Sequence, residues 1–371
     1  MKMNANSIKT YQRDYKLQSR RGFVKAGILA GGAMFVNTRV LPEGISNVPV
    51  SDDPTQCAYA PPGEYIKDHS FLYHDGWWHF FSISGTQGFY HGYNGNEETI
   101  SWSISRDLVN WEFRGHVLHA SQWPGSFDQH EVWAPFVFKG KDQFYLFYAG
   151  IIHPSRPMEY RKLGHDHPWV SQGHKEAMGL AVSKDLTYWD KIADFKKGLS
   201  VEGRDAHVVY DDERDRYLLY STIGTHQANV SQSIDLKKWE SLGICIEFPR
   251  LDPGKDYGQT TKGISNFLHS AESLHVLKHP LTGKWVIMGN WQYAVSDDPT
   301  NFHNSEIKEF KRDINGKMVD MGFACEILYL NGDWYRSGVF GKRDYWKLGF
   351  TKIRWTEDEA FHIAKPSILS G

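Results

Sequence analysis

The sequence predicts an all-β protein built as a five-bladed β-propeller. A first repeat, in which a short apolar run, a tight polar turn and an aromatic-rich run follow one another, occurs five times. The copies lie roughly 50–70 residues apart, a spacing typical of propeller blades. A second repeat, Ser-x-Asp-Leu-x-x-Trp, recurs between these copies. No segment keeps a helical spacing of apolar residues over fifteen positions or so.

The first repeat predicts two paired strands in each blade. Its first apolar run ends at equivalent positions, Tyr73, Phe138, Tyr210, Leu277 and Leu330. Aromatic and apolar residues on both sides of a short polar turn favour an antiparallel hairpin, because such side chains pack well on a pleated surface. We therefore expect five hairpins, one in each blade.

The second repeat predicts how each blade is completed. Three copies cover residues 105–111, 183–189 and 233–239, and residues 296–302 form a weaker fourth copy. Ser and Asp stabilise turns through their side chains, and the Trp then packs on a neighbouring sheet. Each unit becomes a four-stranded antiparallel blade. A β-sandwich is the alternative fold, but it does not explain the four-strand period.

Composition excludes several classes of protein. The net charge of −2 over 371 residues suggests neither a nucleic-acid partner nor an anionic lipid surface. The cysteines Cys57, Cys245 and Cys325 are too few for a disulfide framework, although one bridge is allowed. Aromatic residues make up 15% of the chain, and most of them are expected in the core.

The N-terminal residues resemble a twin-arginine export signal. Arg20 and Arg21 precede Phe23 and Val24, and a Gly- and Ala-rich apolar run covers residues 26–36. The usual residue at the Val24 position is Leu. The run is too short for a permanent membrane span, and a basic, partly helical tail is the alternative.

The chain is accordingly divided into two parts. We expect a signal and linker at residues 1–45 and a catalytic propeller at residues 46–371. The mature protein is expected in the periplasm or outside the cell, without a membrane span. Its oligomeric state is not readable from the sequence.

Two long insertions interrupt the regular spacing of the repeats. They cover residues 151–178 and 249–267, and long loops of this kind often border a site. The first is rich in histidine. A solvated loop is favoured over binding of a metal or an acidic sugar by its four histidines, His153, His165, His167 and His174.

Carboxylates recur at one position of the first repeat. Five residues before the end of each first apolar run lie Asp68, Trp133, Asp205, Glu272 and Cys325. If the repeats surround an axis, three carboxylates converge on it, and converging carboxylates are the working groups of glycosidases. The alternative for each acid alone is a turn residue or a carboxylate that caps backbone N–H groups.

The neighbours of these acids predict different roles. Asp205 follows Arg204, whose charge would keep a nearby carboxylate ionised. Glu272 lies among Ala, Ser and Leu, a poor environment for an anion, and becomes the predicted general acid. Asp68 becomes the predicted general base, acting through water.

The chain resembles the five-bladed propeller glycosidases, above all glycoside hydrolase family 43 and its relatives in families 32, 62 and 117. The resemblance covers about residues 60–340 and rests on four motifs in the family's order. They are Lys67-Asp68-His-Ser-Phe, Trp133-Ala-Pro, Arg204-Asp205-Ala-His-Val and Ala271-Glu272-Ser-Leu. The resemblance implies that Asp68 is the base, that Asp205 tunes and orients the acid, that Glu272 is the acid, and that hydrolysis inverts the anomeric centre.

Several positions depart from the family 43 pattern. His69 and Ala206 stand where Pro often follows the Asp, and Phe136 stands where Asp usually follows Trp-Ala-Pro. The Asn-Asp-Pro-Asn signature of family 32 is absent, although Arg204-Asp205 is similar to that family's Arg-Asp-Pro. The resemblance to family 117, in which a histidine can take the acid role, makes His269 a second candidate acid, although a histidine that only hydrogen-bonds to the site residues is the favoured alternative.

Other residues are expected to bind substrate. They are His69, Trp133, Arg204, His269 and Trp291. Packing in the core is the alternative for the two tryptophans. No cofactor is required, and the resemblance allows a structural calcium or sodium ion in the axial channel.

The expected function is hydrolysis of glycosidic bonds in plant or algal oligosaccharides or polysaccharides. Furanosides and pentopyranosides are favoured as substrates. The alternatives are a glycan-binding propeller without catalysis, a transferase or phosphorylase on the same scaffold, and a fructosidase-like or anhydrogalactosidase-like relative.

Overall fold

The structure is a computed structural model. It describes residues 52–89, 96–121, 123–153, 174–249, 271–310, 313–317, 319–358 and 360–369. The expected export signal, most of both insertions and His269 lie outside the described residues.

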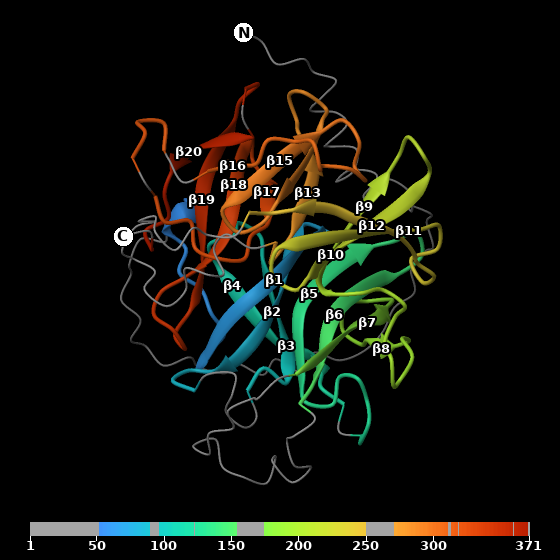
Figure 1. Cartoon of the computed structure of the whole chain (residues 1–371). Coiled ribbons are helices and arrows are strands. Elements are labelled where there is room, and N and C mark those ends of the chain that lie inside the picture. The colour runs from blue at the N-terminus through green and yellow to red at the C-terminus, as the bar shows by residue number, and fades with distance from the viewer. Residues whose placement is uncertain are drawn as a thin grey trace, which may run out of the picture.

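Five antiparallel four-stranded sheets surround a common centre, and the chain passes through them in order around the ring (Figure 1). The prediction of a five-bladed β-propeller is confirmed. A single-turn helix η1 (Pro54–Gln56) precedes the blades. The strands of blades one and two are β1 (Glu64–His74), β2 (Trp77–Thr86), β3 (Thr99–Ser105), β4 (Trp111–His119), β5 (Glu131–Lys139), β6 (Phe144–Ile152), β7 (Lys175–Ser183) and β8 (Asp190–Lys191). The strands of blades three to five are β9 (Arg204–Asp211), β10 (Arg216–Ile223), β11 (Gln227–Ser233), β12 (Glu240–Glu247), β13 (His275–Lys278), β14 (Trp285–Met288), β15 (Gln292–Ser296), β16 (Lys308–Glu309), β17 (Ile327–Leu330), β18 (Asp333–Phe340), β19 (Lys347–Trp355) and β20 (Phe361–Lys365).

The first strand of each blade is the inner one. β1 contacts β5, β5 contacts β9, and β9 contacts β13, so the inner strands neighbour one another around the centre. Asp68 and Asp205 lie in two of these strands, and Glu272 lies three residues before a third, β13. The first insertion is shorter than expected, because β6 ends at Ile152 and β7 begins at Lys175.

The Ser-x-Asp repeats form the turns between the third and fourth strands, as predicted. In the first copy, Ser105 Oγ accepts from the N–H of Leu108 at 3.0 Å, and Asp107 Oδ1 accepts from the N–H of Asn110 at 2.7 Å. Leu108 has a φ of 63°, a left-handed conformation that these side-chain hydrogen bonds help to hold. The indole N–H of Trp111 donates to the carbonyl of Leu108 at 3.2 Å, which folds the Trp back over the turn.

Hydrophobic clusters fill the spaces between neighbouring blades. One cluster joins Leu72, Phe81 and Trp102 of blade one to Val137 and Leu146 of blade two. Equivalent clusters lie between the other pairs of blades, including the pair that closes the ring. Burial of apolar side chains between sheets therefore holds the blades together.

The segment before blade one packs on the last blade. The N–H of Tyr59 donates to the carbonyl of Leu348 in β19 at 3.0 Å, and the N–H of Leu348 returns the bond at 2.7 Å. The N–H of Ile368 donates to the carbonyl of Thr55 at 2.9 Å. Residues close to both ends of the described chain thus fasten the ring.

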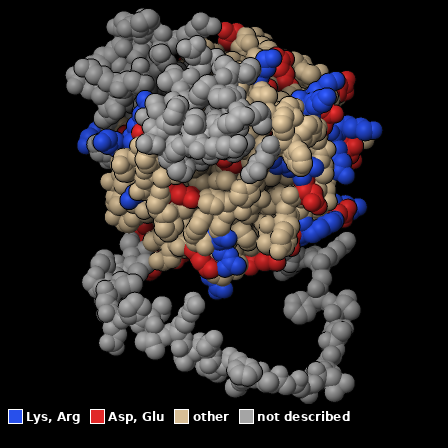
Figure 2. All heavy atoms as spheres, turned by 90° about the horizontal axis from the view of Figure 1, so that it is seen from below, with Lys and Arg blue, Asp and Glu red and all other residues tan. Residues whose placement is uncertain are grey.

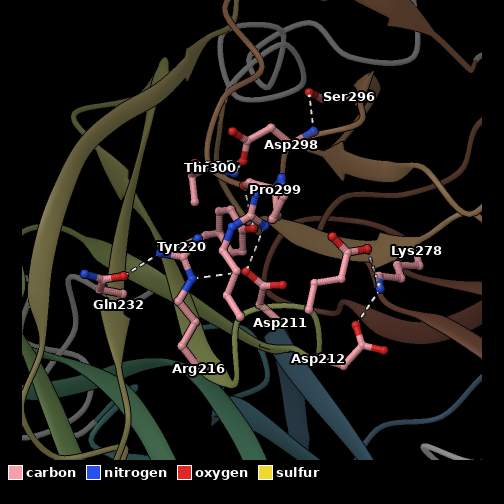
Figure 3. A network of polar contacts seen from close by, with 12 residues as sticks. Asp211, Asp212, Arg216, Tyr220, Gln232, Lys278, Ser296, Asp298, Pro299 and Thr300 are labelled. Atoms are coloured by element: carbon pink, nitrogen blue, oxygen red, sulfur yellow. Dashed lines mark hydrogen bonds and ion pairs between the residues drawn. The ribbon is translucent and has the colours of Figure 1, made fainter.

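A polar network connects blade three to blade four (Figure 3). Asp211 is buried, and its Oδ2 accepts from Arg216 Nε at 3.1 Å. Tyr220 donates its hydroxyl to the carbonyl of Pro299 at 2.7 Å, across the boundary between the two blades. Lys278 of β13 pairs with Asp212 in the turn after β9.

The cysteines, the absence of a membrane span and the small net charge can be compared with the described residues. Cys57, Cys245 and Cys325 are buried free thiols, so the allowed bridge does not form among them. Within the described ranges, no helix has the length and apolar character needed to cross a membrane. Basic and acidic side chains lie side by side on the face shown in Figure 2, in keeping with the small net charge.

Candidate active site

Bulges in the inner strands shape the site. The pairing of β1 with β2 skips Lys67 and Asp68, and the pairing of β9 with β10 skips Asp205 and Ala206. In β5 the skipped pair is 134–135. A bulge bends its strand and redirects its side chains, and bulges are common beside active sites. The repeat position that carries the predicted acids is therefore placed differently relative to the bulge in different blades. Trp133 precedes its bulge, whereas Asp68 and Asp205 lie within theirs.

The bulge at Asp205 depends on two unusual backbone conformations. Asp205 has a φ of 55°, which Asp tolerates better than most residues. Gly203 has a φ of 95°, and a Cβ at this position would lie 2.3 Å from the carbonyl oxygen of Thr222. Glycine at position 203 lets β9 approach β10 closely enough to turn Asp205 inward.

A cleft opens among the bulges and the fifth blade. Asp68 and Asp205 both line it, whereas Glu272 does not and Ser273 beside it does. Its lining residues are Asp68, His69, Ala134, Pro135, Phe136, Asp205, Ala206, Ser273, Leu274, Cys325 and Glu326. Two of the three predicted acids thus face one cavity, and the third stands at its border.

Ser273 of blade four connects acids of blades one and three. Its hydroxyl donates to Asp68 Oδ1 at 2.7 Å, and its backbone N–H donates to Asp205 Oδ2 at 3.2 Å. Ser273 has a φ of 53°, a left-handed backbone conformation that is strained for residues other than glycine. In the sequence Ser273 stands out only as a neighbour of Glu272, because neither bond can be recognised without the fold.

Arg204 lies among carboxylates. Its Nη2 donates to Glu272 Oε1, its Nη1 lies 3.1 Å from Glu176 Oε2, and its Nε lies 3.6 Å from Asp205 Oδ2. Sequence reasoning assigned the Arg204 charge to Asp205 and left Glu272 without a cation. The contact between Arg204 and Asp205 is present, but the expectation for Glu272 was wrong, because Arg204 also reaches across to blade four and pairs directly with Glu272.

The charges of the acids follow from burial as well as from Arg204. Burial raises the pKa of Asp205 to about 7 against the charge of Arg204, and Asp68 and Glu272 add to the rise. Burial also raises the pKa of Glu272, again against Arg204. Asp205 is therefore not held ionised as expected, since desolvation outweighs the adjacent cation.

Glu176 is a residue that the sequence analysis missed. It lies in β7 of blade two, and its Oε1 is 2.6 Å from His174 Nε2. Burial raises its pKa, but the bond to His174 and the charge of Arg204 outweigh that effect, so its pKa lies below the ordinary value. No motif marks this position, because the second blade supplies none of the predicted acids.

The predicted substrate-binding residues lie in different surroundings. Trp133 has the Lys67 ammonium 5.3 Å from its ring centre on one side and the ring of His174 at 5.3 Å on another. Trp291 is buried, and its indole N–H donates to the carbonyl of Gly322 at 3.0 Å, so it packs below the surface. Of the predicted set, Arg204 contacts the acids directly.

His69 lines the cleft, but both of its ring nitrogens are hydrogen-bonded to other residues of the propeller. Its Nδ1 donates to the carbonyl of Lys67 at 3.1 Å, and its Nε2 accepts from the hydroxyl of Ser337 at 2.8 Å. Burial lowers the pKa of His69 to about 4, so the ring is neutral at neutral pH. It supports the bulge that carries Asp68.

Residues 79–243 match the family model of glycosyl hydrolases family 43. The matched segment contains Asp205 and excludes both Asp68 and Glu272. It also contains Glu176 and Arg204, which lie beside Glu272 in the fold. The matched segment therefore includes the bulge of blade three, where Arg204 and Asp205 lie.

Curated relatives match with low identity. A probable sucrose-6-phosphate hydrolase of Psychromonas ingrahamii is 24% identical over 52% of this chain and 34% of its own length. The vacuolar acid beta-fructofuranosidase 2 of a Rosa hybrid cultivar is 26% identical over 66% of this chain and 40% of its own length. The matched region thus spans well under half of either relative.

Solved structures share the propeller. The GH43_1 enzyme from Xanthomonas citri, crystallised with xylotriose, superimposes with a TM-score of 0.56 at 13% identity, covering 84% of this chain and 94% of that one. The GH32 beta-fructofuranosidase of Bombyx mori gives a TM-score of 0.52 at 16% identity, covering 82% and 64%. These likenesses support the fold.

One group of described residues could bring metal ligands together near the centre. Ligand atoms of His207, His275 and Glu326, from blades three, four and five, lie within 4.8 Å of one another. Calcium takes oxygen ligands, whereas this group offers two imidazoles and one carboxylate. Glu326 already accepts from the N–H of Phe71 at 3.1 Å, and burial raises its pKa to about 8. These residues do not fit the calcium ion that the family resemblance allows.

Proposed function

We propose that the protein is a glycoside hydrolase that cleaves furanosides or pentopyranosides of plant or algal origin with inversion. The observation that carries the proposal is the meeting of three carboxylates from three blades through Ser273 and Arg204. Inverting hydrolysis needs one carboxylic acid and one carboxylate on opposite faces of the sugar. Asp68 and Glu272 supply this pair, with Asp205 between them.

In this proposal Asp68 activates the attacking water. The hydroxyl of Ser273 holds Asp68 Oδ1 and leaves the other carboxylate oxygen for the water. Glu272, whose pKa is raised by burial, gives its proton to the leaving oxygen. Arg204 then stabilises the carboxylate that remains on Glu272. Asp205 influences the charges of both Asp68 and Glu272. Asp205 and Glu272 both contact Arg204, and Asp205 and Asp68 both accept hydrogen bonds from Ser273.

Charge favours a neutral sugar over a phosphorylated one. The cations nearest the acids, Lys67 and Arg204, are each paired with carboxylates, Lys67 with Glu97 and Arg204 with Glu176 and Glu272. Within the described part of the site, acids outnumber bases. An anionic substrate would be repelled, so a sugar phosphate is disfavoured.

A second candidate is a fructofuranosidase that retains configuration. It is favoured by the two curated relatives, both of which bear names of sucrose- or fructoside-cleaving proteins. In that mechanism Asp68 would attack the sugar directly, instead of activating water.

A hydrolysis screen with stereochemical readout tests both candidates. The substrates are aryl arabinofuranosides, xylosides, galactosides and fructosides, together with sucrose and algal oligosaccharides. We expect turnover of a furanoside or xyloside, with the inverted anomer seen first by NMR. Glu272→Gln should lose about a hundredfold or more in kcat. The control Glu64→Gln removes a carboxylate that pairs with His116 instead.

The outcomes separate the readings. Retained configuration on a fructoside would support the second candidate. Equal activity in the parent and Glu272→Gln would sink the assignment of Glu272 and bring His269 forward as the acid. Binding of glycans without turnover of any substrate would leave a non-catalytic propeller.

We also propose that residues 1–45 export the protein through the twin-arginine route. The proposal rests on Arg20, Arg21 and the apolar run that follows them. Fusion of this segment to a reporter should place the reporter in the periplasm. The same fusion with both arginines changed to Lys should remain in the cytoplasm, and export of both forms would contradict the proposal.

A further inference from the structure

We infer that Glu176 is a positioning residue that shares Arg204 with Glu272 and thereby helps to keep the proposed acid protonated. The inference rests on the proposed function, since it assigns Glu176 a part in preparing the proposed acid. Three blades take part, because Glu176 comes from blade two, Arg204 from blade three and Glu272 from the start of blade four.

The geometry of Arg204 carries the inference. Its Nη1 lies 3.1 Å from Oε2 and 3.4 Å from Oε1 of Glu176, so both oxygens of that carboxylate face one amino group. Its Nη2 donates to Glu272. The guanidinium is planar and has a fixed fork of donors. The bond between Glu176 and Nη1 therefore fixes the orientation of the guanidinium plane in which Nη2 donates to Glu272.

Glu176 is itself held in place. His174 contacts Oε1 at 2.6 Å, and the side chain of Glu176 is only 20% exposed. His174 in turn lies against the indole of Trp133. Glu176 thus has a defined orientation and does not belong to a solvated surface pair.

Charge gives Glu176 a second effect on the same pair. One guanidinium serves the carboxylates of Glu176, Asp205 and Glu272. If Glu176 lost its charge, more of the Arg204 field would act on Glu272 and favour its ionised form. The general acid would then lose its proton at a lower pH.

The other charged groups around this cluster remain in place in such a variant. Lys67 and Asp68 approach from β1, Asp205 from β9 and His174 from the segment before β7. None of them is bonded to Nη1 of Arg204 among the described contacts, so none replaces Glu176. Glu176→Gln keeps the shape of the side chain and removes only the charge.

The test compares the purified parent, Glu176→Gln, Glu176→Asp and Glu64→Gln. Glu64 is a matched control, because its carboxylate is 19% exposed and pairs with His116 at 2.9 Å without contacting Arg204. Two readouts are taken: the pH profile of kcat/KM, and the titration of the Glu272 carboxyl by NMR on protein with labelled glutamate. The signal of Glu272 is assigned by its loss in Glu272→Gln.

We expect the basic limb of the pH profile in Glu176→Gln to move about one pH unit lower. The NMR midpoint of Glu272 should move in the same direction. Glu176→Asp should restore part of both shifts, and Glu64→Gln should show neither. The acidic limb, which belongs to the base, should move less.

Each outcome decides one question. A Glu272 midpoint that stays unchanged or moves to higher pH in Glu176→Gln would overturn the inference, whatever happens to the rate. A shifted midpoint in a protein without hydrolase activity would support the inference and refute the proposed function. Shifts of equal size in Glu64→Gln would show a general field effect and also overturn it.

Discussion

Ser273 of blade four donates its hydroxyl to Asp68 of blade one at 2.7 Å, across the centre of the propeller. The two residues are 205 positions apart in the chain. The same Ser273 offers its backbone N–H to Asp205. One residue thus links the proposed base to the acid that tunes the site, and it does so in a left-handed conformation with a φ of 53°.

Substitutions at Ser273 distinguish the role of its hydroxyl from that of its backbone conformation. Ser273→Ala and Ser273→Gly should each lower kcat about 10- to 100-fold, because both lose the hydrogen bond to a charged carboxylate. Glycine relieves the strain of the positive φ, so Ser273→Gly should unfold at a higher temperature than Ser273→Ala. Enzyme rates and thermal unfolding check these results. Full activity in either variant would show that the bond does not orient Asp68.

Asp205 should make stability depend on pH in a defined window. Burial raises its pKa from 3.8 to about 7, so between these values the folded state binds more protons than the unfolded state. Stability attributable to this group is full below the ordinary pKa and falls as the pH rises toward 7. Asp205→Asn should therefore unfold at a higher temperature than the parent at pH 8 and show little difference at pH 3.5. Denaturant unfolding at several pH values measures the effect, and a less stable Asp205→Asn at pH 8 would contradict it.

Asp211 should contribute to stability and not to activity. Its buried Oδ2 accepts from Arg216 Nε at 3.1 Å and from Arg214 Nη1 at 3.3 Å. Asp211→Ala should reduce the free energy of unfolding by about 2–3 kcal/mol, since it removes the carboxylate that pairs with the largely buried guanidinium of Arg216. The adjacent Asp212 is 57% exposed and pairs with Lys278. Asp212→Ala should change the free energy of unfolding by less than about 1 kcal/mol, and an equal loss in both variants would argue against burial as the cause.

Removal of divalent ions should leave the protein unchanged. Because the cluster of His207, His275 and Glu326 does not fit calcium, dialysis against EDTA should alter neither the hydrolysis rate nor the unfolding temperature. Added Ca²⁺ should have no effect either. A lower unfolding temperature after dialysis that Ca²⁺ restores would contradict the prediction. Restoration by Zn²⁺ alone would instead indicate imidazole ligands.

Much of the fold was predictable because its signals are local. The Ser-x-Asp turns are set by side chains that bond backbone N–H groups two and three residues away, as at Ser105 and Asp107. The alternation of apolar runs and polar turns specifies hairpins in the same short-range way. Five copies of one such unit must pack on one another, since a single sheet leaves its apolar faces exposed.

The site was predictable only in part. The repeat register selected Asp68, Asp205 and Glu272, and the structure brings all three into one hydrogen-bonded cluster. The bond from Arg204 to Glu272 was not anticipated, and Glu176 and Ser273 were missed. These contacts join residues of different blades, so no spacing within the chain reports them.

The sequence by itself determined the number of blades, the turns between their strands and the three acids that share a repeat position. Only the tertiary structure decided which charges meet. The reason is geometric: a bulge of one extra residue redirects a side chain, and the bulges of β1, β5 and β9 lie at slightly different repeat positions. Their combined directions place Arg204 against Glu272 and Glu176, and Ser273 against Asp68.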